Sequence, residues 1–80
     1  MTAVLHTCFK GGNENRDAGY WLGFVYNLEV VEELKRSIPH TYRRWDADKS
    51  LWWVSAQFEN VLKFMFCNFE ALVYLQQRML

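Results

Sequence analysis

The chain has 80 residues, 51% of them hydrophobic, and its nine Lys and Arg balance nine Asp and Glu, so its formal net charge is zero. This length allows one small core, and we expect residues 1–80 to form a single domain. The hydrophobic content excludes a disordered chain. The charge balance excludes a protein that coats nucleic acid by bulk positive charge, although a local basic patch is compatible with it.

No apolar run approaches the roughly 20 residues that a membrane-spanning helix needs. The first nine residues also lack the cationic start of a signal peptide. We therefore expect no membrane partner and a cytoplasmic location. The two cysteines, Cys8 and Cys67, lie far apart in the sequence, which favours reduced thiols, with a single disulfide as the alternative.

The first half of the chain begins with two apolar segments around a polar one. The polar segment, residues 11–19, holds three of the four glycines and is interpreted as a long hairpin loop. Residues 2–9 before it predict a strand with Val4, His6 and Cys8 on one face and Leu5 on the other. The aromatic residues 20–26 after it predict a second strand, antiparallel to the first.

A helix is predicted over residues 28–37. Asn27 is a typical N-cap, and Lys35 and Arg36 lie late in the helix, as the helix dipole favours. Pro39 ends the helix because the residue before a proline is disfavoured in the α conformation. One helical stripe of apolar residues should face the core, namely Val30, Val31, Leu34 and Ile38.

The second half predicts a hairpin followed by a helical segment. Residues 41–45 and 50–54 are strand candidates around the turn 46–49. Ser55 can cap the C-terminal segment 55–80, in which one bent helix and two short helices, the second capped by Asn68, fit equally. The order β-β-α-β-β-α predicts an α+β two-layer domain, a mostly antiparallel sheet with the helices packed on one face.

Catalysis is poorly supported by the sequence. His6 and Cys8 share a strand face, but structural zinc sites use two close pairs of ligands. Asp46 and Asp48 suit a solvated turn, and Gly11 and Gly12 lack the Lys-Ser/Thr of a phosphate-binding loop. We expect no enzymatic activity, no metal and no cofactor.

A basic and aromatic segment, residues 35–54, is more informative, because its local charge is +3. Cations that meet phosphates beside rings that stack on bases are typical of proteins that bind single strands or junctions. The alternative is a structural hairpin whose aromatic residues fill the core and whose arginines pair with glutamates. The predicted nucleic-acid-binding residues are Lys35, Arg36, Arg43, Arg44, Trp45, Lys49 and Trp52.

Four short motifs within residues 20–54 recur together in one known family. They are Leu-Lys-Arg-Ser-Ile-Pro at 34–39, Arg-Arg-Trp-Asp at 43–46, Lys49, and Trp-Trp-Val at 52–54. In their order and spacing they resemble the HARP-type module, which lies beside helicase cores, notably in annealing helicases. That resemblance implies binding to DNA, often at junctions, through Lys35, Arg43, Arg44, Lys49 and Trp52. No helicase motor is attached in these 80 residues, so the module would act in trans with a helicase, or keep the fold without the binding.

Two functions follow from these observations. The first is a small non-enzymatic DNA-binding accessory module, for single strands or forks, serving recombination, repair or a helicase. The alternative is a protein-interaction or homodimerisation module of phage or mobile-element origin that acts on a partner protein. Its basis is a C-terminal segment with more apolar residues than one helical stripe needs, namely Phe64, Phe66, Tyr74, Leu75, Met79 and Leu80.

Overall fold

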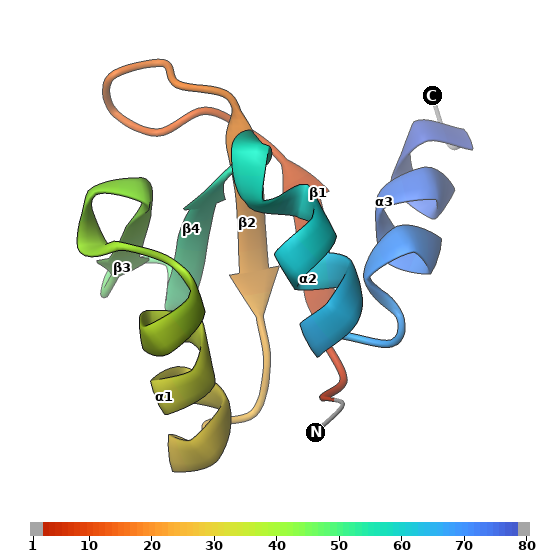
Figure 1. Cartoon of the computed structure of the whole chain (residues 1–80). Coiled ribbons are helices and arrows are strands. Elements are labelled where there is room, and N and C mark those ends of the chain that lie inside the picture. The colour runs from red at the N-terminus through yellow and green to blue at the C-terminus, as the bar shows by residue number, and fades with distance from the viewer. Residues whose placement is uncertain (1–2, 79–80) are drawn as a thin grey trace.

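The computed structural model of the chain describes residues 3–78, and the side chains of residues 3–73. Four strands form one antiparallel sheet in the order β1-β2-β4-β3. The helices α1, α2 and α3 all lie on one side of this sheet, with α3 beside β1 (Figure 1). The predicted α+β class and element order are confirmed, with the last helical segment divided in two.

The sheet has two rows of side chains at its centre, one on each face, because partners across antiparallel strands point to the same side. Cys8, Leu22 and Trp52 belong to the row that faces the helices. The neighbouring row, on the helix-free face, contains Trp21 and Trp53. The strands are β1 (Thr7–Lys10), β2 (Gly19–Gly23), β3 (Arg43–Asp46) and β4 (Leu51–Ser55).

Helix α1 (Leu28–Ser37) confirms its predicted limits. Asn27 Oδ1 accepts hydrogen bonds from the backbone N–H groups of Glu29 at 2.9 Å and Val30 at 3.4 Å. Ile38 leaves the helical conformation, with φ −126°, directly before Pro39. The predicted apolar stripe is buried as expected, so local capping and tertiary packing agree in this helix.

The C-terminal segment contains two α-helices. The chain is extended at Phe66, with φ −120°, where Ala3 donates its backbone N–H to Met65 O at 2.8 Å and accepts one from Cys67 at 3.1 Å. Asn68 binds both backbone groups of Leu5, at 3.0 and 2.8 Å, so its side chain ties down the N-terminal segment. The C-terminal segment begins with the short 3₁₀ helix η2 (Ala56–Phe58), which is followed by α2 (Glu59–Met65) and α3 (Phe69–Arg78). A second short 3₁₀ helix, η1 (His40–Tyr42), lies earlier in the chain, between α1 and β3.

The predicted first strand, residues 2–9, is too long at its start, and Thr2 lies outside the described residues. β1 begins only at Thr7. Ala3 and Leu5 bond to the α2–α3 junction instead of a strand, whereas His6 still donates its backbone N–H to Gly23 O of β2 at 2.9 Å. The predicted alternation is therefore wrong: Val4 and His6 are exposed, whereas Leu5 and Cys8 are buried. The second strand likewise ends at Gly23, three residues early, and this leaves residues 24–26 in a connection to α1.

The core lies between the helices and the sheet, and every strand but β3 contributes to it. Tyr20 connects the layers: its ring packs edge-on against Phe69, with centroids 5.0 Å apart, and its hydroxyl donates to Glu59 Oε1 at 2.6 Å. This hydrogen bond is the main reason why the pKa of Glu59 is lowered. None of the helices in the described part of the chain has the length and apolar character to cross a membrane.

Candidate functional site

The seven predicted nucleic-acid-binding residues do not form one surface. Arg43 and Arg44 are adjacent on β3, so their side chains point to opposite faces of the sheet. Arg43 pairs with Val54 on the helix side, whereas Arg44 pairs with Trp53 on the helix-free side. The structure thus divides the seven residues into three groups: Arg44 and Lys49; Lys35, Arg43, Trp45 and Trp52; and Arg36 alone.

The cations of the helix-free face are neutralised within the molecule. Arg44 forms an ion pair with Glu14 of the β1–β2 loop. Lys49 Nζ lies 3.6 Å from Asp46 Oδ2 and 4.8 Å from the centre of the Trp21 ring. The backbone N–H of Lys49 also donates to Asp46 Oδ1 at 3.0 Å, and this bond is the main reason why the pKa of Asp46 is lowered. A phosphate at this face would have to displace these carboxylates.

The two tryptophans of the helix-free face, Trp21 and Trp53, are buried although no helix covers them; their exposed fractions are 7% and 3%. Trp53 Nε1 donates to Gly11 O at 3.1 Å, so the β1–β2 loop is held against the sheet. Gly19 leaves room for the Trp53 ring, because a Cβ there would lie 2.5 Å from it. These rings are therefore structural, and stacking on a base would require the loop to move.

The second group lies where α1 meets β3. Arg43 Nε donates to Ile38 O at 2.9 Å, at the end of α1. Trp45 is 48% exposed and rests at a tilted angle on the half-buried Trp52, with ring centroids 5.5 Å apart. Lys35 is exposed one turn beyond Val31, which lines a small cavity with both tryptophans.

We call Lys35, Arg43 and Trp45 the basic strip. Within the described side chains, neither of its cations forms an ion pair with an acid. Of the predicted nucleic-acid-binding residues, these three retain free charge and an accessible ring on one side of the molecule. Trp52 packs between the Trp45 ring and the core.

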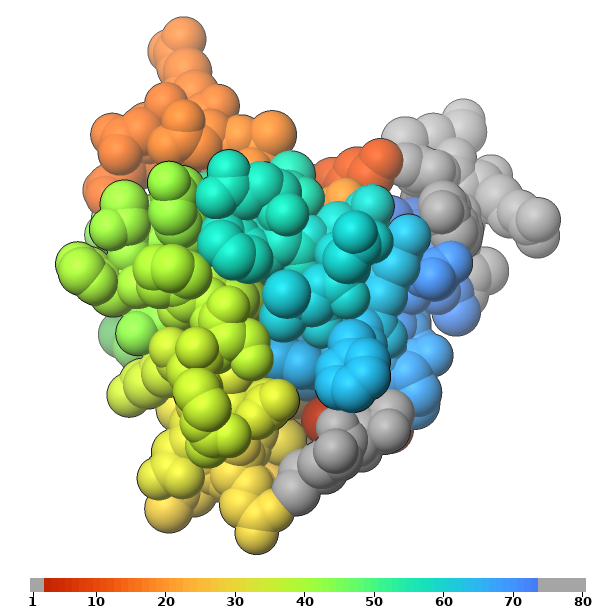
Figure 2. Space-filling model, viewed as in Figure 1, coloured from red at the N-terminus to blue at the C-terminus, as the bar shows by residue number. Residues whose placement is uncertain are grey.

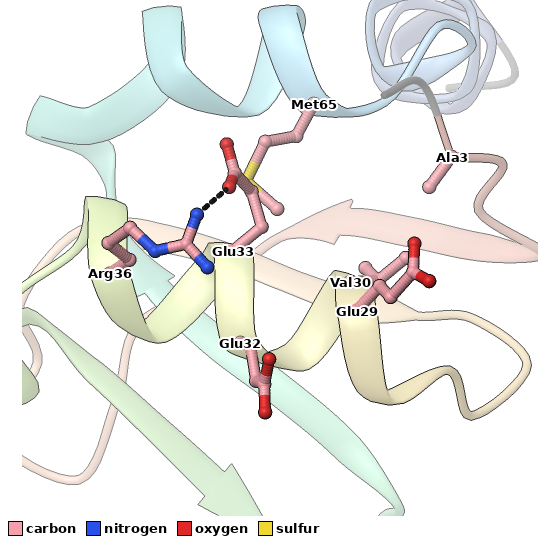
Figure 3. A pocket seen from close by; sticks show the side chains of 7 residues that line it. All are labelled: Ala3, Glu29, Val30, Glu32, Glu33, Arg36 and Met65. Atoms are coloured by element: carbon pink, nitrogen blue, oxygen red, sulfur yellow. Dashed lines mark hydrogen bonds and ion pairs between the residues drawn. The ribbon is translucent and has the colours of Figure 1, made fainter.

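Arg36 lies on the other flank of α1, where the helix borders α2. It forms an ion pair with Glu33 at 2.9 Å and lines a cavity of about 230 Å³ between α1, α2 and the N-terminal segment (Figure 3). Ala3, Val30 and Met65 provide its apolar surface. We call this site the acidic groove, because its remaining lining residues are Glu29, Glu32 and Glu33.

Sequence reasoning missed an apolar surface at the β2–α1 connection. Val25 is 82% exposed, Tyr26 73% and Leu28 57%, and Val4 beside them is 64% exposed. Val4, Val25 and Tyr26 border one cavity, and Tyr26 borders a second one together with Trp45. We call Val4, Val25, Tyr26 and Leu28 the apolar end. The sequence signal was present as an aromatic and β-branched run, but that pattern predicted a strand.

The C-terminal surface behind the alternative function is only partly described. Phe64 is 77% exposed on α2, whereas Phe66 is 1% exposed and belongs to the core. The side chains of Tyr74 and Leu75, and the residues Met79 and Leu80, lie outside the described part of the chain. Of the six residues predicted for this surface, Phe64 is therefore the one whose described side chain is exposed.

The thiols and other ligand-type side chains show no built reactive site among the described residues. Cys8 and Cys67 are both free, and burial raises the pKa of Cys8 to about 12, which keeps it a neutral thiol. No three side chains from His, Cys, Asp and Glu are grouped to hold a metal in the part of the chain that the structure describes.

The fold and surfaces define a small α+β domain with three candidate binding surfaces, the basic strip, the acidic groove and the apolar end. Comparisons of the chain with protein-family models, curated protein sequences and solved structures found no match.

Proposed function

We propose that the protein is a non-enzymatic interaction module that binds a partner protein through the apolar end. One observation carries this proposal: Val25 and Tyr26, large apolar residues at consecutive positions, are 82% and 73% exposed. Large contiguous apolar surface in contact with water is unfavourable for a small protein and typically marks a binding site.

The shape and charge of this surface also support protein binding. Two cavities meet at Phe24 and Tyr26, so a partner side chain has a concave place beside an aromatic ring. Tyrosine and tryptophan in such positions contribute strongly to protein interfaces. The formal net charge of zero favours association over long-range electrostatic capture.

A double variant, Val25→Ser with Tyr26→Ser, tests the proposal. Partner proteins would be captured on the immobilised wild-type protein and purified. Their affinity for the wild-type protein and for the variant would then be measured by titration calorimetry. The variant should weaken binding by at least about tenfold, because it removes two apolar anchors. Both positions are exposed, so the free energy of unfolding should change little.

Phe64→Ser is the matched control, because it also removes an exposed apolar side chain but lies on α2. Binding that is lost in Phe64→Ser and retained in the double variant would contradict the proposal and favour the C-terminal surface. Sedimentation equilibrium separates the two kinds of partner: a monomer at all concentrations would exclude a second copy of the chain as the occupant.

A second function, DNA binding in recombination, repair or helicase assistance, is favoured by the basic strip. Lys35 and Arg43 carry free charge beside the half-exposed ring of Trp45, a combination that suits a phosphate and an adjacent base. The similarity to the HARP-type module also favours it. With two phosphate contacts, affinity for duplex DNA should fall with salt with a log–log slope of about −2.

Fluorescence anisotropy with single-stranded, duplex and forked DNA tests this function. Lys35→Ala with Trp45→Ala should weaken the binding and reduce the slope to about −1, because it removes one of the two phosphate contacts and the accessible ring. Arg44→Ala is the matched control and should bind like wild type, since Glu14 already neutralises that guanidinium. If wild type shows no salt-sensitive binding at micromolar protein, the protein lacks this function.

A further inference from the structure

We propose that the acidic groove and the apolar end together bind a basic amphipathic segment of a partner protein. This inference rests on the protein-binding function proposed above and adds the chemistry of the partner. It is carried by three features of the described residues: an apolar floor, a rim of unneutralised carboxylates, and the continuity of the groove with the apolar end.

The floor of the groove can accept apolar side chains. Val30 and Met65 come from the facing sides of α1 and α2, and Ala3 closes one end (Figure 3). The cavity of about 230 Å³ is open to solvent and lies between the two helices, which are neighbours on the surface (Figure 2). Such a cavity is suited to an amphipathic helix that places its apolar side in the groove.

The rim of the groove carries excess negative charge. Arg36 neutralises Glu33 through the ion pair at 2.9 Å, but Glu29 and Glu32 have no cationic partner within the described side chains. A purely apolar occupant would remove water from these two carboxylates without replacing it, which is unfavourable. Lysine or arginine side chains at the edge of the occupant would complement them.

The groove and the apolar end form one surface. Ala3 and Val30 line both the cavity of the groove and the cavity beneath Val25 and Tyr26. A segment with apolar residues along one side can therefore contact Met65, Val30 and Val25 in turn. The cations of this partner segment would then lie beside Glu29 and Glu32. A partner segment that binds the apolar end should therefore be basic on the side opposite its apolar residues.

Selection from a random linear peptide library on the purified full chain tests this inference. We expect the enriched peptides to be basic and amphipathic and to bind at micromolar concentrations or tighter by fluorescence anisotropy. Glu29→Gln with Glu32→Gln should weaken this binding by about three- to tenfold, the range expected for two exposed ion pairs. Added salt should weaken wild-type binding and have little effect on the variant.

Glu70→Gln is the matched control, because Glu70 is also an exposed acid in the first turn of a helix, α3, and it should bind like wild type. Enriched peptides that are acidic or uncharged, and that depend on Val25 and Tyr26, would overturn this inference and leave the proposed function standing. Peptides indifferent to Val25→Ser with Tyr26→Ser, or no enrichment at all, would overturn both.

Discussion

At the scale of single residues, Tyr20 connects the sheet to both C-terminal helices. Its side chain comes from the middle of the sheet, is 6% exposed, and reaches both C-terminal helices through Phe69 and Glu59. A buried hydroxyl that donates to a carboxylate is worth more than a neutral hydrogen bond, but Glu59 is partly in water, which reduces the gain.

Tyr20→Phe should therefore lower the free energy of unfolding by about 1 kcal/mol at neutral pH. The pKa of Glu59 is lowered in the folded state, so its ionised form stabilises the fold above the unfolded pKa of about 4.3 and this contribution is lost as the pH falls through the folded pKa. Urea unfolding at neutral pH and at about pH 3 should show the difference between variant and wild type narrowing in acid.

Tyr42→Phe is the control for this experiment, because the Tyr42 ring packs on Phe58 at 5.4 Å and is more exposed. It should leave stability and its pH dependence nearly unchanged. An equal loss for Tyr20→Phe at both pH values would show that the carboxylate is not the source of the effect.

At the scale of elements, the break between α2 and α3 is made by the N-terminal segment. Ala3 pairs with Phe66, and Asn68 satisfies both backbone groups of Leu5. The apolar pattern of residues 58–73 runs through the break without interruption. For that reason the sequence could not distinguish one bent helix from two, since the deciding contacts come from residues more than 60 positions away.

Asn68→Ala should destabilise the protein by roughly 2 kcal/mol, because two part-buried backbone groups lose their partners together. Amide hydrogen exchange at Leu5 should accelerate more than exchange in β2. Asn60→Ala, on the exposed side of α2, should leave both quantities unchanged. If exchange at Leu5 is unaffected in Asn68→Ala, the side chain does not hold this segment.

At the scale of the whole molecule, the sheet has a different kind of cover on each face. The helices bury one face, whereas the β1–β2 loop, which reaches toward the β4–β3 side of the sheet (Figure 1), shields Trp21 and Trp53 on the other. Both tryptophans lie on the same central strands as the core residues Leu22 and Val54, so the two sides should unfold together.

The variant Trp45→Phe with Trp52→Phe leaves Trp21 and Trp53 as the only fluorescent tryptophans of the four in the chain. Thermal unfolding followed by their fluorescence should coincide with unfolding followed by far-ultraviolet circular dichroism. The wild-type protein, in which all four report, provides the reference curve. A fluorescence transition at lower temperature would show that the loop and the helix-free face unfold separately.

Features of the fold and the candidate site could be predicted from the sequence where neighbouring residues determine them. They could not be predicted where contacts between residues far apart in the sequence determine them. The limits of α1 follow from Asn27 and Pro39, which are local signals, and they were predicted correctly. The opposite directions of Arg43 and Arg44 follow from strand geometry, but the partner of Arg44 is a loop residue 30 positions away, which no local pattern indicates. Val25 and Tyr26 have strand-forming side chains, so their exposure depends on β2 ending early at Gly23.

The pairing of the segment around Leu5 with Asn68 has a consequence for the order of folding. During synthesis the β1–β2 hairpin and α1 can form from neighbouring residues, but Leu5 cannot find its hydrogen-bond partners until Asn68 has left the ribosome. Closing a loop of that length is slow compared with local contacts. We therefore expect the docking of residues 3–5 to be a late step, and the apolar surface of α2 and α3 to be at greatest risk of aggregation just before it.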